Sequence, residues 1–352
     1  MKHILDKLNC KIDNILKENG IAGCSVAVTN RRGLIYSRGF GTVDVSSGAP
    51  TLDNSIYRAA SVTKMVTGAL TMRLVEEERL SLDSLVKEYI PELSLESDVA
   101  RDTMTIRHLL SHTSGLPKEY TPEGPLDEGM LADSLFSALP TLHLESMPED
   151  RKYLYSNWGI RLLSLVLERI TGERFSSLAQ KHILVPLGMR DSFFFLPEDR
   201  LARRSLPHYK TDSGLVSDTR IKENYTRLAT GGLYSTATDL ATLARFYLCD
   251  GVTDSGERII SAPAISEMRK PISQFPSGDT YGLTIQMHTT PCGIEVYGHY
   301  GNADPYTSAL YVCPDYGLGA VVLLNTYHDT LRRVIAELLI DTFAEGSAGE
   351  TN

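Results

Sequence analysis

The chain has 352 residues with a formal net charge of −9 at pH 7, and 42% of its residues are hydrophobic and 22% charged. This composition is typical of a globular protein with a sizeable core. The sequence shows no cluster of Lys and Arg that would neutralise phosphates, so nucleic acid is excluded as a partner.

Cysteine and histidine usage argues against a metal site or a disulfide framework. The five cysteines are scattered, odd in number and lack C-x-x-C spacing. His108 and His112 lie four residues apart, the spacing of two ligands on one helix face, but no Glu follows the first His as H-E-x-x-H requires. We therefore expect no metal and no cofactor.

The N-terminal segment predicts an amphipathic helix. Apolar residues recur at helical spacing, and Gly20 stands where the helix would end: Leu5, Leu8, Ile12, Ile15 and Leu16. Charged residues interrupt this segment throughout, unlike the apolar core of a signal peptide. No later stretch is long enough to span a bilayer. We therefore expect a cytoplasmic protein with no membrane partner.

The next elements along the chain begin with a predicted β-hairpin. Residues 24–30 and 34–41 are apolar or alternating runs joined by the turn RRG. A helical pattern begins at Ser61 and continues through MVTGALTMRLVEEE. From about 65 to 225 the signals are mainly helical, and a broad apolar face over 162–170 ends at Gly172.

Strand-like runs return after residue 280, and a final amphipathic helix is predicted from about 330 to 343. Strands at both chain ends with helices between them predict an α/β plus α fold. We expect an antiparallel sheet flanked by the terminal helices, with an all-helical inserted lobe. The predicted boundaries are 1–62 and 226–352 for the α/β domain and 63–225 for the mainly helical lobe, with the site at their junction.

The first candidate for chemistry is Ser61, which stands three residues before Lys64 in the run Ser-Val-Thr-Lys. Residues three apart share a helix face, so the amine can reach the hydroxyl. A buried lysine loses solvation, so its pKa falls and it can act as a base near neutrality. The motif alone is weak, because Ser84 and Lys87 repeat it and Ser61 could simply cap a helix.

The second candidate is Tyr155-Ser156-Asn157, which stands just before a predicted helix. A tyrosine can pass a proton to a leaving group, and an asparagine can hydrogen-bond the lysine or a substrate amide. The alternative is that Asn157 only caps the helix that begins at Trp158.

The third candidate is His299-Tyr300-Gly301-Asn302, at the end of a predicted strand. A glycine at 301 lets substrate backbone lie against the strand edge in the manner of an added strand. The backbone N–H of Asn302 could then form an oxyanion hole with that of Ser61. The alternative for His299 is an ordinary strand residue with a hydrogen-bonded ring.

In order and spacing, these three motifs resemble the class C β-lactamase-like serine hydrolases. That family includes class C β-lactamases, low-molecular-weight penicillin-binding proteins, D-aminopeptidases and carboxylesterases. Further signatures cover nearly the whole chain: RAASVTK, TIRHLLSHTSGL, YSNWG, LVPLGM, ATGGLYSTATDLA and YGL. The resemblance implies the β-lactamase and penicillin-binding-protein fold and no cofactor.

The resemblance also implies a role for each site residue. It makes Ser61 the acylated nucleophile, Lys64 its activating partner, Tyr155 the general base and acid, and Asn157 an orienting group. The backbone amides of Ser61 and Asn302 would form the oxyanion hole. His299, Gly301 and Asn302, together with Asn157, are expected to bind and orient the substrate.

The chain departs from the family at the third motif. True β-lactamases carry Lys-Thr-Gly where this chain has His299-Tyr300-Gly301. A histidine is largely neutral near pH 7, so recognition of a substrate carboxylate at this position should weaken. The H-x-G form resembles D-aminopeptidases and several esterases. Asp304 and Pro305 replace a glycine-rich run of many relatives, and an Asp304 facing the cleft would favour a substrate amine.

The function predicted from the sequence is hydrolysis of a small ester, or of a D-configured amide or short peptide, through an acyl-enzyme at Ser61. Three alternatives stay open at this stage. They are a β-lactamase, a biosynthetic acyltransferase with an amine acceptor, and a non-catalytic penicillin-binding sensor. No oligomeric state is predicted.

Overall fold

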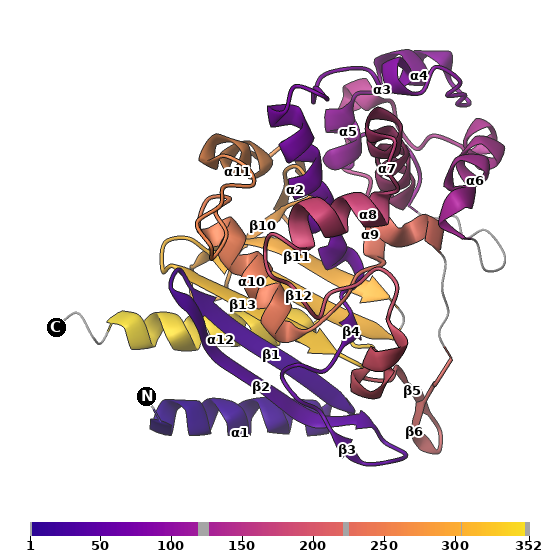
Figure 1. The fold of residues 1–352 in the computed structure, drawn as a ribbon. Helices are drawn as coiled ribbons and strands as arrows, with labels where there is room; N and C mark the ends of the chain where they lie inside the picture. Colours follow the sequence, from indigo (N-terminus) through magenta and orange to yellow (C-terminus); the bar gives the residue numbers. More distant parts are fainter. Residues whose placement is uncertain (1, 119–126, 221–224, 304, 349–352) are drawn as a thin grey trace.

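The computed structural model describes residues 2–118, 127–220, 225–303 and 305–348. Its centre is an antiparallel sheet of nine strands in the order β3-β2-β1-β13-β12-β11-β10-β9-β8 (Figure 1). The two ends of the chain meet where β1 (Gly23–Asn30) pairs with β13 (Leu318–Leu324). The predicted hairpin is confirmed, because β1 also pairs with β2 (Gly33–Asp44).

The rest of the sheet consists of the other C-terminal strands and one short N-terminal strand. Their bounds are β3 (Ala49–Pro50), β8 (Ser273–Gln274), β9 (Thr280–Tyr281), β10 (Gln286–Thr289), β11 (Glu295–Ala303) and β12 (Tyr306–Cys313). Each neighbouring pair runs antiparallel. The strands predicted after residue 280 are therefore confirmed.

Helices cover both faces of the sheet. The terminal helices α1 (Lys2–Glu18) and α12 (Leu331–Ala348) lie on one face, and α10 (Ala237–Leu248) packs on the other (Figure 1). Alternate side chains of β13 enter the two cores, with Val322 in the core beside α12 and Val321 in the opposite core. Burial on both faces explains why the run LGAVVLLN is apolar throughout rather than alternating.

The helical part of the molecule lies between β4 (Tyr57–Arg58) and β7 (Tyr234–Ser235), which pair with each other. Its helices are α2 (Thr63–Glu76), α3 (Val86–Tyr89), α4 (Asp98–Thr103), α5 (Ile106–Leu110), α6 (Leu131–Ala138), α7 (Asn157–Thr171), α8 (Phe175–Ala179) and α9 (Leu228–Gly231). Gly172 ends α7 in the left-handed conformation, with φ at 75°. A further helix, α11 (Ala262–Met268), follows α10.

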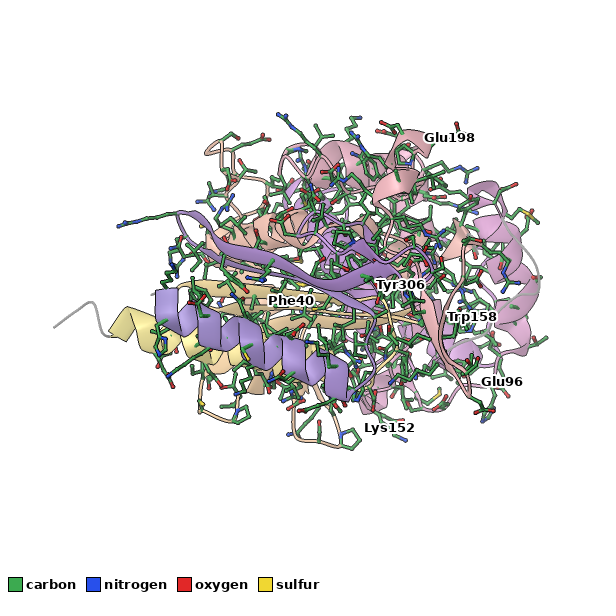
Figure 2. The ribbon with its side chains drawn as sticks, turned by 90° about the horizontal axis from the view of Figure 1, so that it is seen from below. Phe40, Glu96, Lys152, Trp158, Glu198 and Tyr306 are labelled. Carbon is green, nitrogen blue, oxygen red and sulfur yellow. The ribbon has the colours of Figure 1, made fainter. Side chains whose placement is uncertain are left out.

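A short hairpin was not predicted within this mainly helical stretch. It consists of β5 (His208–Thr211) and β6 (Gly214–Ser217), which pair only with each other as a two-stranded sheet. Figure 2 shows the two cores of the molecule: Phe40 lies at the sheet beside α1, whereas Trp158 lies in the helical part. The α/β plus α fold predicted from the sequence is confirmed.

Within the described residues, we find no helix whose length and apolar content would let it cross a lipid bilayer.

Candidate active site

Ser61 lies on a short 3₁₀ turn, Ala60–Val62, directly before α2. Ala60 has a left-handed backbone with φ at 49°, a strained conformation for a residue with a Cβ. Neighbouring hydrogen bonds hold this turn: Ser308 Oγ donates to Ala59 O at 2.7 Å, and Thr63 Oγ1 donates to Ala60 O at 2.6 Å. The turn presents the Ser61 side chain to a cleft, of which it forms part of the lining.

Lys64 lies one turn further along, on α2, and its side chain is fully buried. Its Nζ donates hydrogen bonds to three oxygens: Ser61 Oγ at 3.1 Å, Asn157 Oδ1 at 2.8 Å and Thr230 O at 2.7 Å. Three acceptors match the three N–H donors of an ammonium group. This arrangement fixes the amine beside the Ser61 hydroxyl rather than leaving it in solvent.

Tyr155 approaches Ser61 from the other side. Its hydroxyl donates to Ser61 Oγ at 2.8 Å, and its ring centroid lies 4.9 Å from Lys64 Nζ. Helix α7 begins two residues later and is capped by Ser156, whose Oγ accepts from Gly159 N. Because Ser156 is the cap, the Asn157 carboxamide is available to bind Lys64. The structure therefore brings Ser61, Lys64, Tyr155 and Asn157 into one hydrogen-bonded group.

Gly301 lies on β11, where this strand crosses the Ser61 turn. A Cβ added to Gly301 would lie 2.6 Å from Ser61 N and 2.7 Å from Ala60 Cβ. Only a glycine allows the strand to come so close, since real Cβ contacts are essentially never shorter than 3.0 Å. Asn302 follows on the strand and lines the cleft. The backbones of Ser61 and Asn302 thus lie on two sides of this close approach.

The structure contradicts the expectation that the His299 side chain binds the substrate. Its ring is fully buried and lies outside the cleft lining. The Nδ1 atom contacts Tyr300 O at 2.6 Å, so Nδ1 carries the proton, and Nε2 accepts from Tyr281 Oη at 3.1 Å. Burial, reinforced by the charge of Lys64, lowers the pKa of His299 to about 3. Both ring nitrogens are engaged inside the wall, and the imidazole is neutral.

A second buried histidine supports the Tyr155 ring. The His112 ring centroid lies 4.3 Å from that of Tyr155 and 4.9 Å from that of Tyr281. Its Nδ1 accepts from Ser156 N at 3.1 Å. Burial, followed by the charge of Lys64, lowers the pKa of His112 well below 6.5. His112 therefore packs as a neutral ring behind the phenol.

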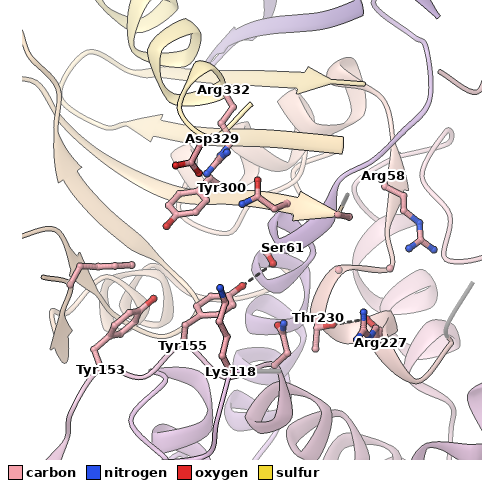
Figure 3. A pocket seen from close by; sticks show the side chains of 16 residues that line it. Arg58, Ser61, Lys118, Tyr153, Tyr155, Arg227, Thr230, Tyr300, Asp329 and Arg332 are labelled. Carbon is pink, nitrogen blue, oxygen red and sulfur yellow. Dashed lines mark hydrogen bonds between the residues drawn. The ribbon is translucent and has the colours of Figure 1, made fainter. Parts of the chain in front are cut away.

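The cleft above Ser61 has a volume of about 500 Å³ and is rich in cations (Figure 3). Four basic side chains line it: Arg58, Lys118, Arg227 and Arg332. Among the lining residues that the structure describes, Asp329 is the one acid. Aromatic side chains from three segments complete the wall beside Tyr155: Tyr153, Phe275 and Tyr300.

No sequence motif assigned a role to these lining residues. Arg58 lies inside the quoted signature RAASVTK, and Tyr300 lies inside the third motif, so both had a local signal. Arg227, Arg332 and Phe275 come from segments far apart in the chain, and only the fold brings them together. The Thr230 carbonyl that binds Lys64 carries no residue-type signal at all.

The structure also gives the positions of His108 and His112, the two histidines that lie four residues apart in the sequence. His108 caps its own helix, because its Nδ1 accepts from Thr105 N at 3.1 Å, and His112 is engaged as described above. In the described part of the chain, no three His, Cys, Asp or Glu side chains are grouped as metal ligands would be. Asp304 lies outside the described residues.

Sequence comparisons match nearly the whole chain. A protein-family model described as Beta-lactamase matches residues 8–344. The chain is 28% identical over 344 residues to penicillin-binding protein 4 of Amycolatopsis lactamdurans, with 93% of this chain and 88% of that protein covered. It is also 28% identical to beta-lactamase-like protein 2 of Dictyostelium discoideum, over 97% of this chain and 64% of that protein.

Solved structures share the fold. The octameric penicillin-binding protein homologue of Pyrococcus abyssi aligns with a TM-score of 0.80 and 26% identity, over 96% of this chain and 76% of that one. The class C beta-lactamase of Rhodobacter sphaeroides aligns with a TM-score of 0.77 and 20% identity, over 96% of this chain and 99% of that one.

Proposed function

Because the chain belongs to the beta-lactamase family, we propose that it is a serine hydrolase that forms an acyl-enzyme at Ser61. Its substrates are small esters or D-configured amides and short peptides. One observation carries the proposal: Ser61 Oγ lies within hydrogen-bonding distance of both Lys64 Nζ and Tyr155 Oη, at the wall of a cleft. This is the arrangement of a nucleophile with its activating partners.

In the acylation step, Ser61 Oγ attacks the substrate carbonyl carbon, and a new C–O bond forms. Attack requires the Tyr155–Lys64 pair to have lost one proton, so that one of its two groups is a free base; this base takes the Ser61 hydroxyl proton, and the pair then returns a proton to the departing oxygen or nitrogen as its bond to carbon breaks. Asn157 and Thr230 O hold the Lys64 amine in place throughout. Because Lys64 Nζ and Tyr155 Oη both contact the attacking oxygen, neither group has to move before the proton does.

The negative charge that develops on the carbonyl oxygen needs two fixed donors. The backbone N–H groups of Ser61 and Asn302 are the candidates, and the missing side chain of Gly301 lets their two segments approach. Deacylation repeats the chemistry with water. Water loses a proton to the Tyr155–Lys64 pair and its oxygen bonds to the acyl carbon; the bond between that carbon and Ser61 Oγ then breaks, and the pair returns the proton to Ser61.

Esters and D-configured amides are favoured by the state of His299. The position that carries a lysine in true β-lactamases holds a neutral, buried imidazole here. The H-x-G pattern resembles that of D-aminopeptidases and esterases. The wall behind Tyr155 therefore contributes no fixed positive charge of the kind that draws a drug carboxylate to this point.

Hydrolysis of β-lactams is the second candidate, and one observation favours it. Arg332 lines the cleft although its side chain is almost fully buried, and its guanidinium lies 4.6 Å from the Tyr300 ring centroid. This cation could bind a substrate carboxylate in place of the absent lysine. The Amycolatopsis relative is a penicillin-binding protein by name, which agrees with recognition of a β-lactam and leaves its hydrolysis to be tested.

The proposal is tested by a substrate panel measured on wild type and Ser61→Ala. p-Nitrophenyl esters, D- and L-aminoacyl anilides and nitrocefin are assayed side by side, with and without a nucleophilic amine. We expect turnover of esters or D-anilides that Ser61→Ala abolishes. An amide product in the presence of amine would indicate acyl transfer, and preferential turnover of nitrocefin would favour the second candidate. Turnover that survives in Ser61→Ala would overturn the proposal.

A further inference from the structure

The position of Tyr155 defines a leaving-group side of the cleft. Tyr155 Oη lies 2.8 Å from Ser61 Oγ and belongs to the pair that protonates the departing atom in the proposed function. A proton passes between groups within hydrogen-bonding reach, so the departing oxygen or nitrogen must lie next to Tyr155. The rest of the leaving group then lies against the wall on the Tyr155 side of Ser61. The residues of that wall therefore select the leaving group.

Three aromatic rings form this wall. Tyr153, Phe275 and Tyr300 all line the cleft, and each of these side chains is only partly buried. Figure 3 shows Tyr153, Tyr155 and Tyr300 toward the same side of Ser61. The ring centroids of Tyr153 and Phe275 lie 4.3 Å apart, so these two rings form one continuous surface. Aromatic surface thus reaches the cleft beside the point of proton transfer.

A buried ring supports two of the three rings. The fully buried Tyr281 ring has its centroid 5.6 Å from that of Tyr153 and 6.0 Å from that of Phe275. Tyr281 therefore covers one side of this pair, while the pair lines the cleft on another side. Apolar surface that is supported by the core and left open at a cleft wall is typical of a small-molecule binding site.

Backbone hydrogen bonds fix the segments that carry these two rings. Leu154, the neighbour of Tyr153, donates from its N–H to His112 O at 2.8 Å. Phe275 N donates to Asp279 O at 2.8 Å across a tight turn. The third ring is carried by strand β11. Because the wall is held in place before a substrate arrives, binding a flat group against it costs little conformational entropy.

The phenols of the wall are uncharged at neutral pH. Burial raises the pKa of both Tyr153 and Tyr300 above the ordinary value, so both keep their protons. Asp329 and Arg332 lie beside Tyr300 and carry opposite charges (Figure 3). The wall beside Tyr155 thus offers contact with aromatic rings rather than one sign of charge.

We propose that the leaving group of the substrate is aromatic, and that Tyr153, Phe275 and Tyr300 bind its ring on the Tyr155 side of Ser61. The substrate class is then an ester of an aryl or arylalkyl alcohol, or an amide of an aromatic amine. This inference rests on the proposed function, because it takes Ser61 as the acylated atom and Tyr155 as a proton donor to the leaving atom.

The test compares three butyrate esters that differ only in the leaving alcohol: 2-phenylethanol, 2-cyclohexylethanol and ethanol. All three are unactivated primary alcohols, so the chemistry at the carbonyl is nearly the same. The ratio of kcat/KM values reports the steps up to acylation, in which the alcohol is still present. We expect the phenylethyl ester to exceed the ethyl ester by about 10- to 100-fold. It should exceed the cyclohexylethyl ester by about 2- to 10-fold, the gain from contact between aromatic rings.

Variants locate the preference. Phe275→Leu and Tyr153→Leu keep apolar bulk and remove a ring, so each should lower the ratio of the phenylethyl to the cyclohexylethyl kcat/KM. The double variant should bring this ratio close to unity, whereas Tyr153→Phe keeps the ring and should keep the ratio. Thermal unfolding of each variant shows that it is folded.

Phe195→Leu is the matched control. Phe195 is an exposed phenylalanine outside the cleft lining, and its ring centroid lies 5.0 Å from that of Tyr225. Loss of this ring removes an aromatic contact elsewhere in the molecule, so the ratio should stay at the wild-type value.

The outcomes separate this inference from the proposed function. A wild type that hydrolyses the phenylethyl and cyclohexylethyl esters equally, or a ratio that survives in the double variant, overturns the aromatic leaving-group site and leaves the hydrolase standing. Hydrolysis of none of the three esters by an enzyme that a fluorophosphonate labels at Ser61 overturns the site as well. If p-nitrophenyl butyrate is also left intact and Ser61 resists the probe, the proposed function itself fails.

Discussion

Replacing Gly301 with alanine perturbs the site without removing any of its functional groups. The added methyl would lie 2.6 Å from both Ser61 N and Ser308 Oγ, and 2.7 Å from Ala60 Cβ. Ser308 can turn its hydroxyl away, but Ser61 N and Ala60 Cβ belong to the backbone turn. Ordinary contact begins at 3.4 Å, so β11 and the Ser61 turn must separate by about 0.8 Å.

That displacement would open the gap between the Ser61 and Asn302 amides. A misplacement of about 1 Å costs about 100-fold in rate, which corresponds to about 2.7 kcal/mol of transition-state stabilisation. Overpacking should also destabilise the fold by about 1–3 kcal/mol. We therefore expect kcat/KM for a p-nitrophenyl ester to fall about 100-fold in Gly301→Ala, with a smaller loss in thermal stability.

Gly159→Ala is the matched control, because a Cβ at that helical position meets ordinary contacts of 3.5 Å or more. It should keep wild-type activity and gain slightly in stability, since alanine is a better helix former. A Gly301→Ala variant that folds and retains activity within threefold of wild type would refute the reasoning, because the two amides would then not depend on this approach.

Three further predictions follow from the same contacts. Tyr155→Phe removes the hydroxyl that contacts Ser61, so kcat should fall by about 10²–10⁴-fold while KM changes little, as steady-state kinetics will show; unchanged kcat would remove Tyr155 from proton transfer. Below pH 6.5 the unfolded chain protonates His299, whereas the folded chain resists protonation down to about pH 3. The free energy of unfolding should therefore decrease as the pH is lowered, by up to about 1.4 kcal/mol per pH unit. Urea unfolding between pH 7 and pH 4 should show a shallower loss in His299→Gln, and parallel curves would contradict this origin. His299→Lys places a cation in a fully buried site under the field of Lys64, so urea unfolding at pH 7 should show a loss of about 3–5 kcal/mol, and wild-type stability would contradict that burial.

Much of the fold follows from local sequence patterns. The periodicity of apolar residues and the positions of turn residues predict three of its parts: the hairpin of β1 and β2, the apolar C-terminal strands and the helix that ends at Gly172. The β5–β6 hairpin was missed because its strands are only four residues long and lie within a mainly helical stretch. Strands this short give too few alternations to outweigh the surrounding pattern.

The features of the site also fall into two groups: those that sequence motifs indicate and those that only the tertiary fold reveals. Short motifs indicated Ser61, Lys64, Tyr155 and Asn157 because each depends on residue type at fixed spacing, and the structure places all four in one group. The orientation of His299 could not be read from spacing, because it depends on Tyr281, which reaches the ring only through the sheet.

The left-handed turn at Ala60 and the Thr230 carbonyl are backbone features, and neither requires a characteristic side chain. The cationic lining comes from four segments that only the tertiary fold assembles. Such features leave no pattern in the sequence.

The most direct measurement is the rate and position of fluorophosphonate labelling, followed by intact mass and peptide mapping. If the hydroxyl of Ser61, the amine of Lys64 and the phenol of Tyr155 act together at the cleft, the label will be found on Ser61 and its rate will drop at least 100-fold in both Lys64→Met and Tyr155→Phe. Labelling of a different residue, or an undiminished rate in both variants, would contradict the account.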